Sequence, residues 1–202
     1  MTDQEFEALF DRLMTSRREE MRTRFNRVLP TGELIFNRFE KAPYLHAGHE
    51  SSVYDTSVVM GDVQIGSHVW VGPYTLLDGS SAPLKIGNYV SVDTGVTIYT
   101  HDSTRHYVSG GINPFEHGPV TIGDCTVLGT MSMVCCNVSI GSHCVVAAHS
   151  FVNQDVPDCS IVAGVPARVI GRVELNEDGA RFVYFHSTYK SFSKEAQDES
   201  ES

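Results

Sequence analysis

Positive charge is scarce in this sequence. Its 202 residues include 15 Lys and Arg against 25 Asp and Glu, which gives a formal net charge of −10. Proteins that bind nucleic acid gather Lys and Arg against the phosphate backbone. The charge balance therefore argues against a nucleic-acid-binding protein.

Long apolar runs are absent as well. No stretch approaches the roughly 20 apolar residues that cross a bilayer, and the amino end is too acidic for a secretory signal peptide. We therefore expect no membrane insertion. A chain of 202 residues is sized for one domain with small appendages.

Cysteines are few, and their arrangement excludes two common uses. There are five, an odd number, and the adjacent pair Cys135 and Cys136 suits neither a disulfide framework nor a CxxC metal site. We expect the cysteines of the central region, Cys125, Cys135, Cys136 and Cys144, to be small apolar packing residues. The composition favours a reduced, cytoplasmic protein.

Aliphatic residues, by contrast, recur with a fixed spacing of six. Six of them are followed directly by glycine, where a tight corner can use a residue without a Cβ. Short strands with a corner every six residues predict a parallel β-helix, a solenoid of stacked coils. The repeating positions are Val53, Val59, Ile65, Val71 and Leu77, then Ile86, Val92 and Ile98, then Ile122, Leu128, Val134, Ile140, Val146 and Val152.

Two interruptions break the repeat. Three extra residues occur around "DGSSAP", between Leu77 and Ile86. Between Ile98 and Ile122 the phase survives, but the positions six apart inside that stretch could not fill an apolar lumen. We predict that residues 102–119 leave the solenoid as a loop and return. Long loops on a rigid scaffold tend to carry binding and catalytic groups.

Helical and irregular segments flank the repeat. Apolar residues at three-to-four spacing predict a helix over residues 3–28, and a second segment, 34–44, leads into the solenoid. We expect residues 1–50 to cap the open end of a β-helix that spans residues 51–173, although the helix could instead bind substrate. In residues 174–202 we expect a short strand, "ARFVYF", and an acidic tail from residue 190 onward that is disordered.

Three six-residue faces per coil stack specific polar residues on one another. Leu77, Ile98, Val134 and Val152 then lie on one face, about 4.8 Å apart. The residues three positions after each of these lie at the same corner of successive coils. The residues one position after each of these also stack, as a column beside that corner. The corner holds Ser80, His101, Asn137 and Asp155, and the column holds Asp78, Tyr99, Cys135 and Asn153.

His101 therefore stands at the base of the loop, with a Ser or Asp below it and Asn137 above it. This is a plausible site, although a solvated corner histidine would look the same. His68 and His143 fall at a second corner and His149 at a third, so they cannot converge with His101 within one chain. His106 and His117 lie in the loop and could reach the site, or could be solvated. His46, His49 and His186 lie outside the repeats and indicate no site.

Several segments resemble the hexapeptide-repeat acyltransferases. The resemblance covers about residues 50–173 and is closest to the maltose and galactoside O-acetyltransferases and the polysaccharide-cluster acetyltransferases. The order "LKIGNYVSVDTGVTIYTHDS", loop, "GPVTIGD" is especially similar to that branch. The other matching segments are "IGSHVWVG", "VTIGDCTVLGTMSMV", "VSIGSHCVVAAHSFVNQDVP" and "SIVAGVPARVIGRV".

The resemblance implies a fold and an assembly. The fold is a left-handed parallel β-helix, a hand that cannot be derived from the residues. The assembly is a homotrimer with acetyl-CoA in the groove between neighbouring subunits. No metal is expected.

The resemblance also implies roles for individual residues. His101 matches the catalytic histidine, although in the sugar acetyltransferases two more residues usually precede it. Asp78 matches an acidic residue beside the sugar acceptor. Ala147, Ala148 and Ser150 match the segment along the pantetheine arm, and Ala163, Gly164, Pro166 and Arg168 match the segment beside the adenine and 3′-phosphate. Where many members carry Thr-Lys this chain has Asn153-Gln154, which leaves Arg168 as the stronger phosphate ligand.

The leading hypothesis is acetyl transfer from acetyl-CoA to a sugar hydroxyl, with His101 as general base. Asp102, Glu116 or a backbone carbonyl could orient the second ring nitrogen, and a backbone N–H near Gly129, Thr130 or Asn137 could steady the oxyanion. Glu116 and Asn137 would thereby face the substrate.

Three alternatives stay open. The first is N-acetylation of a nucleotide-linked amino sugar, and the second is a γ-type carbonic anhydrase with His101, His143 and His149 on zinc. The third is a β-helix that serves only as a scaffold.

Overall fold

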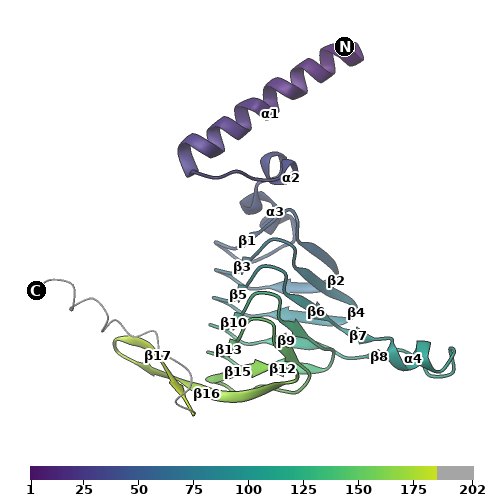
Figure 1. The fold of residues 1–202 in the computed structure, drawn as a ribbon, viewed down its shortest axis with the longest axis vertical. Coiled ribbons are helices and arrows are strands. Elements are labelled where there is room, and N and C mark those ends of the chain that lie inside the picture. The colour runs from purple at the N-terminus through teal and green to yellow at the C-terminus, as the bar shows by residue number, and fades with distance from the viewer. Residues whose placement is uncertain (186–202) are drawn as a thin grey trace, which may run out of the picture.

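The coils of the chain stack into a parallel β-helix with helices at its amino end (Figure 1). The computed structural model describes residues 1–185. The solenoid has about six coils and winds with the left-handed sense that the resemblance implied. The tail from residue 190 onward, expected to be disordered, lies outside the described residues.

Each coil has three faces, and each face is a ladder of short strands. The first face is β1 (Ser52–Val53), β3 (Trp70–Val71), β5 (Ser91–Val92), β10 (Val127–Leu128), β13 (Val145–Val146) and β15 (Ser160–Gly164). The second face is β6 (Thr97–Tyr99), β11 (Met133–Val134), β14 (Phe151–Val152) and the first residues of β2 (Val58–Ile65) and β4 (Leu76–Ile86). The third face is β9 (Val120–Ile122), β12 (Val138–Ile140) and the last residues of β2 and β4.

The register confirms the predicted stacking. Leu77 pairs with Ile98, Ile98 with Val134, and Val134 with Val152. All four side chains are at most 1% exposed, so they fill the lumen. Full burial of an aliphatic side chain contributes about 1.5–3 kcal/mol, so the repeat supplies the core of the fold.

Glycines follow the buried positions because neighbouring coils approach closely there. A Cβ on Gly123 would lie 2.5 Å from the Ser142 nitrogen of the next coil, and one on Gly129 would lie 2.7 Å from the Ala148 nitrogen. The left-handed backbone of the corner falls two residues later, for example on Cys125 (φ 56°) and Met131 (φ 56°). These glycines therefore serve packing between coils.

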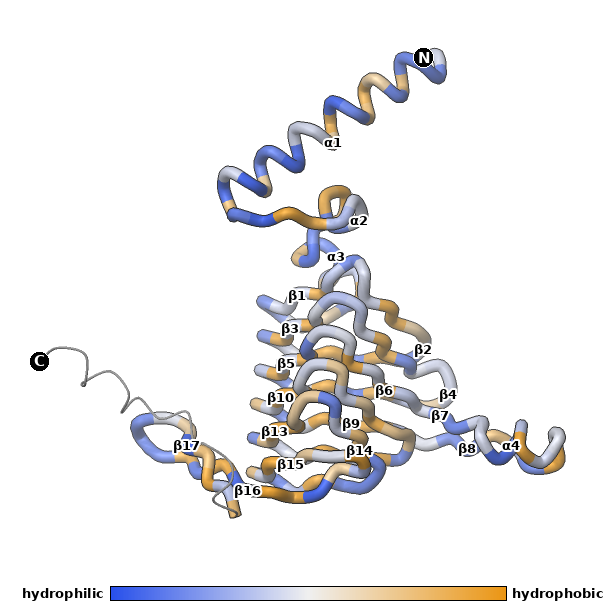
Figure 2. Tube along the Cα trace, viewed as in Figure 1, coloured by the Kyte–Doolittle hydropathy of each residue, from blue (hydrophilic) through white to orange (hydrophobic). Residues whose placement is uncertain are grey.

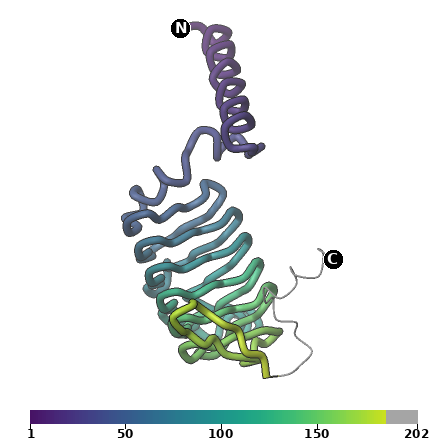
Figure 3. Tube along the Cα trace, turned by 90° about the vertical axis from the view of Figure 1, so that its left-hand side faces the viewer, coloured from purple at the N-terminus to yellow at the C-terminus, as the bar shows by residue number. Residues whose placement is uncertain are grey.

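Capping of the open end falls to the short helices. α1 (Asp3–Phe25) begins at a Thr2–Glu5 capping box but buries only Met14 and projects away from the coils (Figures 1 and 3). α2 (Thr31–Ile35) connects it to α3 (Arg38–Tyr44), whose Ala42 packs into the core. Lys41 Nζ donates to the carbonyls of Tyr54, Asp55 and Ser57 at 3.1, 2.8 and 2.8 Å. Within the amino-terminal region expected to cap the solenoid, it is thus α3 and not α1 that packs against the coils.

The carboxyl end leaves the parallel stack as an antiparallel hairpin. β16 (Ala167–Asn176) pairs antiparallel with β15, and β17 (Gly179–Tyr184) pairs with β16, which confirms the strand predicted from "ARFVYF". Apolar residues recur along each coil but also along α1 (Figure 2). Among residues 1–185, no helix combines the length and apolar character needed to cross a membrane.

Burial separates the cysteines expected to pack in the core. Cys144 is buried at 1% exposure, whereas Cys125 is exposed and Cys135 and Cys136 are half-buried. The expectation is therefore right for Cys144 and wrong for Cys125, because the left-handed corner turns that side chain outward.

Candidate active site

Both interruptions of the repeat lie at one edge of the solenoid, between the second and third faces. We call it the loop edge. β4 bulges there, where its pairing with β2 shifts after Gly61–Gly79 and resumes at Val63–Leu84. The buried Thr100 hydroxyl of the next coil donates to the Asp78 carbonyl at 2.9 Å and accepts from the Ala82 nitrogen at 3.2 Å. The bulge is thereby fixed directly against the coil from which the loop leaves.

Residues 102–119 leave the solenoid, as predicted, but they are not irregular. β7 (His101–Asp102) and β8 (Glu116–His117) pair antiparallel as a stalk, and α4 (Thr104–Val108) lies beyond it. Figure 1 shows this stalk projecting from the coils. The chain returns in phase, since Ile122 pairs with Ile86. His101 is thus the first residue of the stalk.

His101 lies between aromatic side chains and a carboxylate. Its ring lies edge-on to Tyr99, with centroids 5.9 Å apart, and stacks on Phe115 at 6.3 Å. Its Nδ1 is 3.4 Å from Asp78 Oδ2, and the side chain is 27% exposed. The contact lacks hydrogen-bond geometry, and the buried Nδ1 has no hydrogen-bond partner among the described residues.

Asp78 is a buried carboxylate held in place by the bulge. Its side chain is 3% exposed. Oδ1 accepts from the Ser80 backbone nitrogen at 2.9 Å and from the Ser80 hydroxyl, while Oδ2 faces His101. Burying a carboxylate is costly unless it has such hydrogen-bond partners. The carboxylate against His101 therefore comes from the coil below, where the stacking had placed an Asp or Ser.

Asp102 and Glu116, the carboxylates considered for orienting His101, are engaged elsewhere. Asp102 Oδ1 accepts from the Thr104 nitrogen at 2.7 Å, and hydrogen bonding to Thr104 lowers the pKa of the Asp102 carboxyl, with Arg105 adding to the effect. Glu116 pairs with Arg105 at 3.1 Å. The structure instead puts Asp78 against the ring nitrogen.

Asn137 shares the loop edge with His101, one coil further on, as predicted. It is exposed and has a left-handed backbone (φ 61°). The returning loop packs on it, because a Cβ on Gly118 would lie 2.5 Å from the Asn137 Cβ. Asn137 thus lies directly beside the base of the stalk.

The residues expected along acetyl-CoA lie together on a different edge, between the first and second faces. We call it the small-residue edge. Gly129, Ala147 and Ala163 occupy three successive coils there, with Ala148 and Gly164 beside them and Ser150 just beyond. The Gly164 nitrogen donates to the Ser150 hydroxyl at 3.2 Å. The Gly129 nitrogen donates to the Val146 carbonyl at 2.8 Å, so it is not available to an oxyanion.

One face separates the two edges within a chain. A strand of about five residues at about 3.3 Å each spans roughly 15–20 Å. His101 and the small-residue edge therefore do not meet in one copy of the chain.

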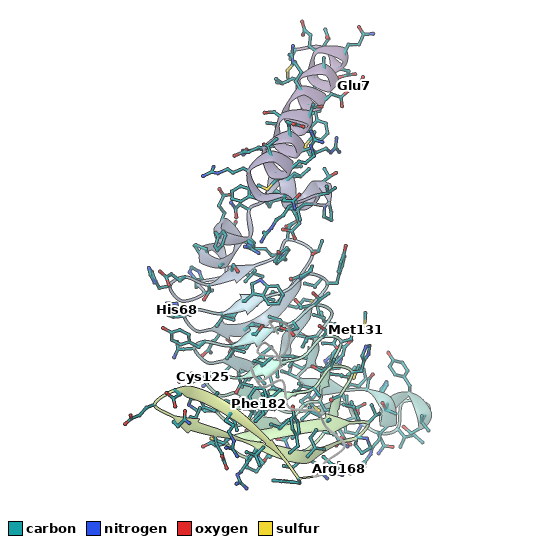
Figure 4. The ribbon with its side chains drawn as sticks, turned by 60° about the vertical axis from the view of Figure 1, so that its left-hand side comes forward. Glu7, His68, Cys125, Met131, Arg168 and Phe182 are labelled. Atoms are coloured by element: carbon teal, nitrogen blue, oxygen red, sulfur yellow. The ribbon has the colours of Figure 1, made fainter. Side chains whose placement is uncertain are left out.

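Arg168 lies at the carboxyl end of the coils, in β16 opposite Ala163 (Figure 4). The residue is exposed, and its guanidinium Nη1 donates to the Ala167 carbonyl at 2.7 Å. It lines a cavity of about 90 Å³ together with Asn153 and Gln154.

The remaining histidines divide as their spacing predicts. His143 and His149 lie on two further edges, so they do not converge with His101 in one chain. His106 does approach the site, with its ring 4.7 Å from Phe115. Phe115 itself was missed, because nothing in its spacing distinguishes it within the loop.

The comparisons with known proteins agree on one kind of chemistry. No protein-family model matches the chain. It is 35% identical over 78 residues to 2,3,4,5-tetrahydropyridine-2,6-dicarboxylate N-acetyltransferases of Staphylococcus aureus strains, a match that covers 39% of this chain. The matched part is about a third of the length of those relatives (33%).

Solved structures extend the likeness over the coils. A hexapeptide-repeat containing acetyltransferase from Vibrio cholerae, complexed with acetyl-CoA, is 28% identical, with a TM-score of 0.60 over 82% of this chain and 89% of that one. A variant of AntD, an N-acyltransferase from Bacillus cereus complexed with dTDP-4-amino-4,6-dideoxyglucose and coenzyme A, is 25% identical, with a TM-score of 0.56 over 61% and 70%. These comparisons support the hexapeptide-repeat acyltransferase family for this chain, without singling out the maltose and galactoside O-acetyltransferase branch.

Proposed function

We propose that this chain is an acetyl-CoA-dependent acyltransferase that acetylates a hydroxyl of a sugar or polysaccharide precursor. The observation that carries the proposal is the contact of His101 with the buried Asp78 carboxylate at the base of the stalk. A histidine oriented by a carboxylate is the usual arrangement of a general base. The similar acetyltransferase bound to acetyl-CoA supports the same donor. The five free cysteines of this chain fit a reducing cytoplasm.

In this mechanism the two nitrogens of His101 have different tasks. Asp78 favours the proton on Nδ1, which leaves the lone pair of Nε2 for the acceptor. The acceptor oxygen attacks the thioester carbonyl as Nε2 takes its proton. The tetrahedral intermediate then expels CoA as a thiolate, which recovers the proton from the imidazolium. The 3.4 Å contact is expected to shorten as positive charge develops on the ring.

The donor would be bound where two copies of the chain meet. Because His101 and the small-residue edge are separated by a whole face, acetyl-CoA on that edge reaches the His101 of a second copy. A closed ring of three copies would repeat this contact, which is the homotrimer that we propose.

The other residues then have defined places in this groove. Gly129, Ala147, Ala148, Ser150, Ala163 and Gly164 would contact the pantetheine arm and adenine, and Arg168 the phosphates. Asn137, Glu116 and Asp78 would lie nearest the acceptor.

N-acetylation of a nucleotide-linked amino sugar is the second candidate. It is favoured by AntD, which was solved with an amino sugar nucleotide, and by the curated relatives, which are N-acetyltransferases. A free amine is nucleophilic once deprotonated, so this reaction would depend less on His101. Within one chain His101, His143 and His149 lie on three different edges, so a γ-type zinc site would have to be shared between copies of the chain, and metal analysis tests it.

Release of free CoA with a panel of acceptors tests the proposal. Sugars, lipid-linked sugars and nucleotide-linked amino sugars are each offered with labelled acetyl-CoA. Label on an alkali-labile ester supports O-acetylation, and label on an amide supports the second candidate. A thermal shift with CoA distinguishes both from a scaffold. No CoA binding and no label on any acceptor would contradict enzymatic activity.

A further inference from the structure

Three potential metal ligands converge at the start of the solenoid, at the edge between the third and first faces. We call it the glycine edge, because Gly66, Gly87, Gly123 and Gly141 lie along it. His49, Glu50 and His68 each offer one ligand atom there, and these atoms lie within 4.8 Å of one another. His68 Nδ1 is 2.9 Å from Glu50 Oε2. Figure 4 shows His68 on the outside of the first coils.

The stacking of coils holds these side chains together. His49 and Glu50 occupy the corner before β1, and His68 occupies the same corner one coil later. The His68 nitrogen donates to the His49 carbonyl at 2.8 Å. Glu50 and His68 both have left-handed backbones (φ 57° and 58°), which turn both side chains outward. The His68 ring also stacks on Tyr89, with centroids 4.3 Å apart and planes 13° apart.

The rest of the same edge offers a natural contrast. Cys125, His143 and Cys159 occupy equivalent corner positions on later coils, with φ of 56°, 58° and 56°. Among the described residues, however, only the His49, Glu50 and His68 group brings three ligand atoms within that distance. Convergence is therefore particular to the first corner, where adjacent residues of one coil face a histidine of the next.

Two imidazoles and a carboxylate are a known ligand set for borderline divalent ions. They bind Zn²⁺ at about 2.0–2.2 Å and leave a fourth position for water. We propose that His49, Glu50 and His68 bind a divalent transition-metal ion of this class. The three ligand atoms lie within 4.8 Å of one another. Small side-chain rotations would bring them to the shorter separations of ligands around one tetrahedral ion. In the absence of an ion, the Glu50–His68 contact is a simple polar pair.

A bound ion would clamp the first corner to the second coil. The corner lies directly after α3, the helix that covers the open end, so the clamp would stabilise that end of the solenoid. His68 and His101 lie on different edges, which separates the metal site from the acetyl-transfer site. The proposal therefore does not depend on the proposed enzymatic function.

Calorimetric titration of the tag-free, full-length protein with ZnCl₂ tests this. We expect about one Zn²⁺ per chain, and a Tm higher by about 5 °C at a zinc concentration of about 100 Kd. His68→Ala and Glu50→Gln should each weaken binding by about 10–100-fold. His143→Ala is the matched control, a histidine in the same corner conformation, and should bind Zn²⁺ like the wild type.

Two different variants are used so that misfolding of one does not decide the test. Glu50→Gln keeps the shape of an exposed side chain, and circular dichroism checks that each variant is folded. Absence of zinc binding by the wild type would overturn the proposal. So would zinc binding that persists unchanged in both His68→Ala and Glu50→Gln, since the ion would then lie elsewhere.

Discussion

The loop edge and the small-residue edge are built from the same repeat but differ in what interrupts it. The small-residue edge keeps its six-residue spacing through successive coils and presents Gly129, Ala147 and Ala163. The loop edge carries a bulge on one coil and an excursion on the next, and there a buried carboxylate meets His101. The regular edge presents a row of small residues, whereas the irregular edge carries the His101–Asp78 contact. The groups that we propose as catalytic thus lie where the repeat is broken.

Of the changes at the two edges, removal of His101 should have the largest effect on activity. We expect His101→Ala to lower kcat by about 10²–10⁴-fold, because the general base is lost, while CoA binding changes little. Steady-state kinetics and CoA titration measure the two effects. His143→Ala, on another edge, is the control, and turnover by His101→Ala at the wild-type rate would remove the loop edge from the mechanism.

Substitution inside the lumen should affect both edges equally, through stability. Leu128 is fully buried and Val127, its neighbour, is 37% exposed. Leu128→Ala should lower the free energy of unfolding by about 2–5 kcal/mol, because it leaves a cavity. Val127→Ala should cost much less. Denaturant unfolding compares them, and equal losses would contradict the assignment of inward and outward positions.

The two aspartates near His101 allow a sharper distinction within the loop edge. Asp78→Asn should lower kcat by about 10–100-fold, since the developing imidazolium loses its carboxylate. Asp102→Asn should change kcat by less than about threefold, because Asp102 accepts from Thr104 and not from the ring. Kinetics of both variants check the order. A larger loss in Asp102→Asn would make Asp102 the positioning residue.

Bulk on the small-residue edge should have the smallest of these effects. Ala148 is exposed, so Ala148→Trp is expected to fold but to raise KM for acetyl-CoA by about tenfold, or about 1.4 kcal/mol. Ala180→Trp, on the carboxyl-terminal hairpin, is the matched control. If both variants had the wild-type KM, the donor would lie elsewhere.

Sequence spacing predicted the solenoid well because each coil repeats one physical requirement. A side chain such as Ile98 must be aliphatic to fill the lumen, so its periodicity gives the fold, the register and the place of the loop. The same periodicity placed an Asp or Ser below His101 and Asn137 above it. The residues of the small-residue edge also came together because they are repeat positions.

What the spacing could not predict depends on unique contacts. The Asp78–His101 contact arises because the bulge aims one carboxylate, and no period encodes that. The stalk strands are two residues long, too short for an alternating pattern. His49 was set aside although Gly48 precedes Gly66 by 18 residues, one full coil. The spacing also could not say which helix of residues 1–50 packs against the coils, because an amphipathic pattern does not identify the surface that a helix contacts.

Mixing two inactive variants tests the central claim, that the catalytic site is completed by a second copy of the chain. His101→Ala lacks the base but keeps the small-residue edge. A chain with Ala147→Trp and Ala148→Trp keeps His101 but blocks its own edge. After subunit exchange in a 1:1 mixture, about a quarter of the sites combine an intact His101 with an intact edge, so we expect about a quarter of wild-type acetyl transfer. A mixture that forms mixed oligomers yet stays inactive would place the whole site within one chain and contradict the account.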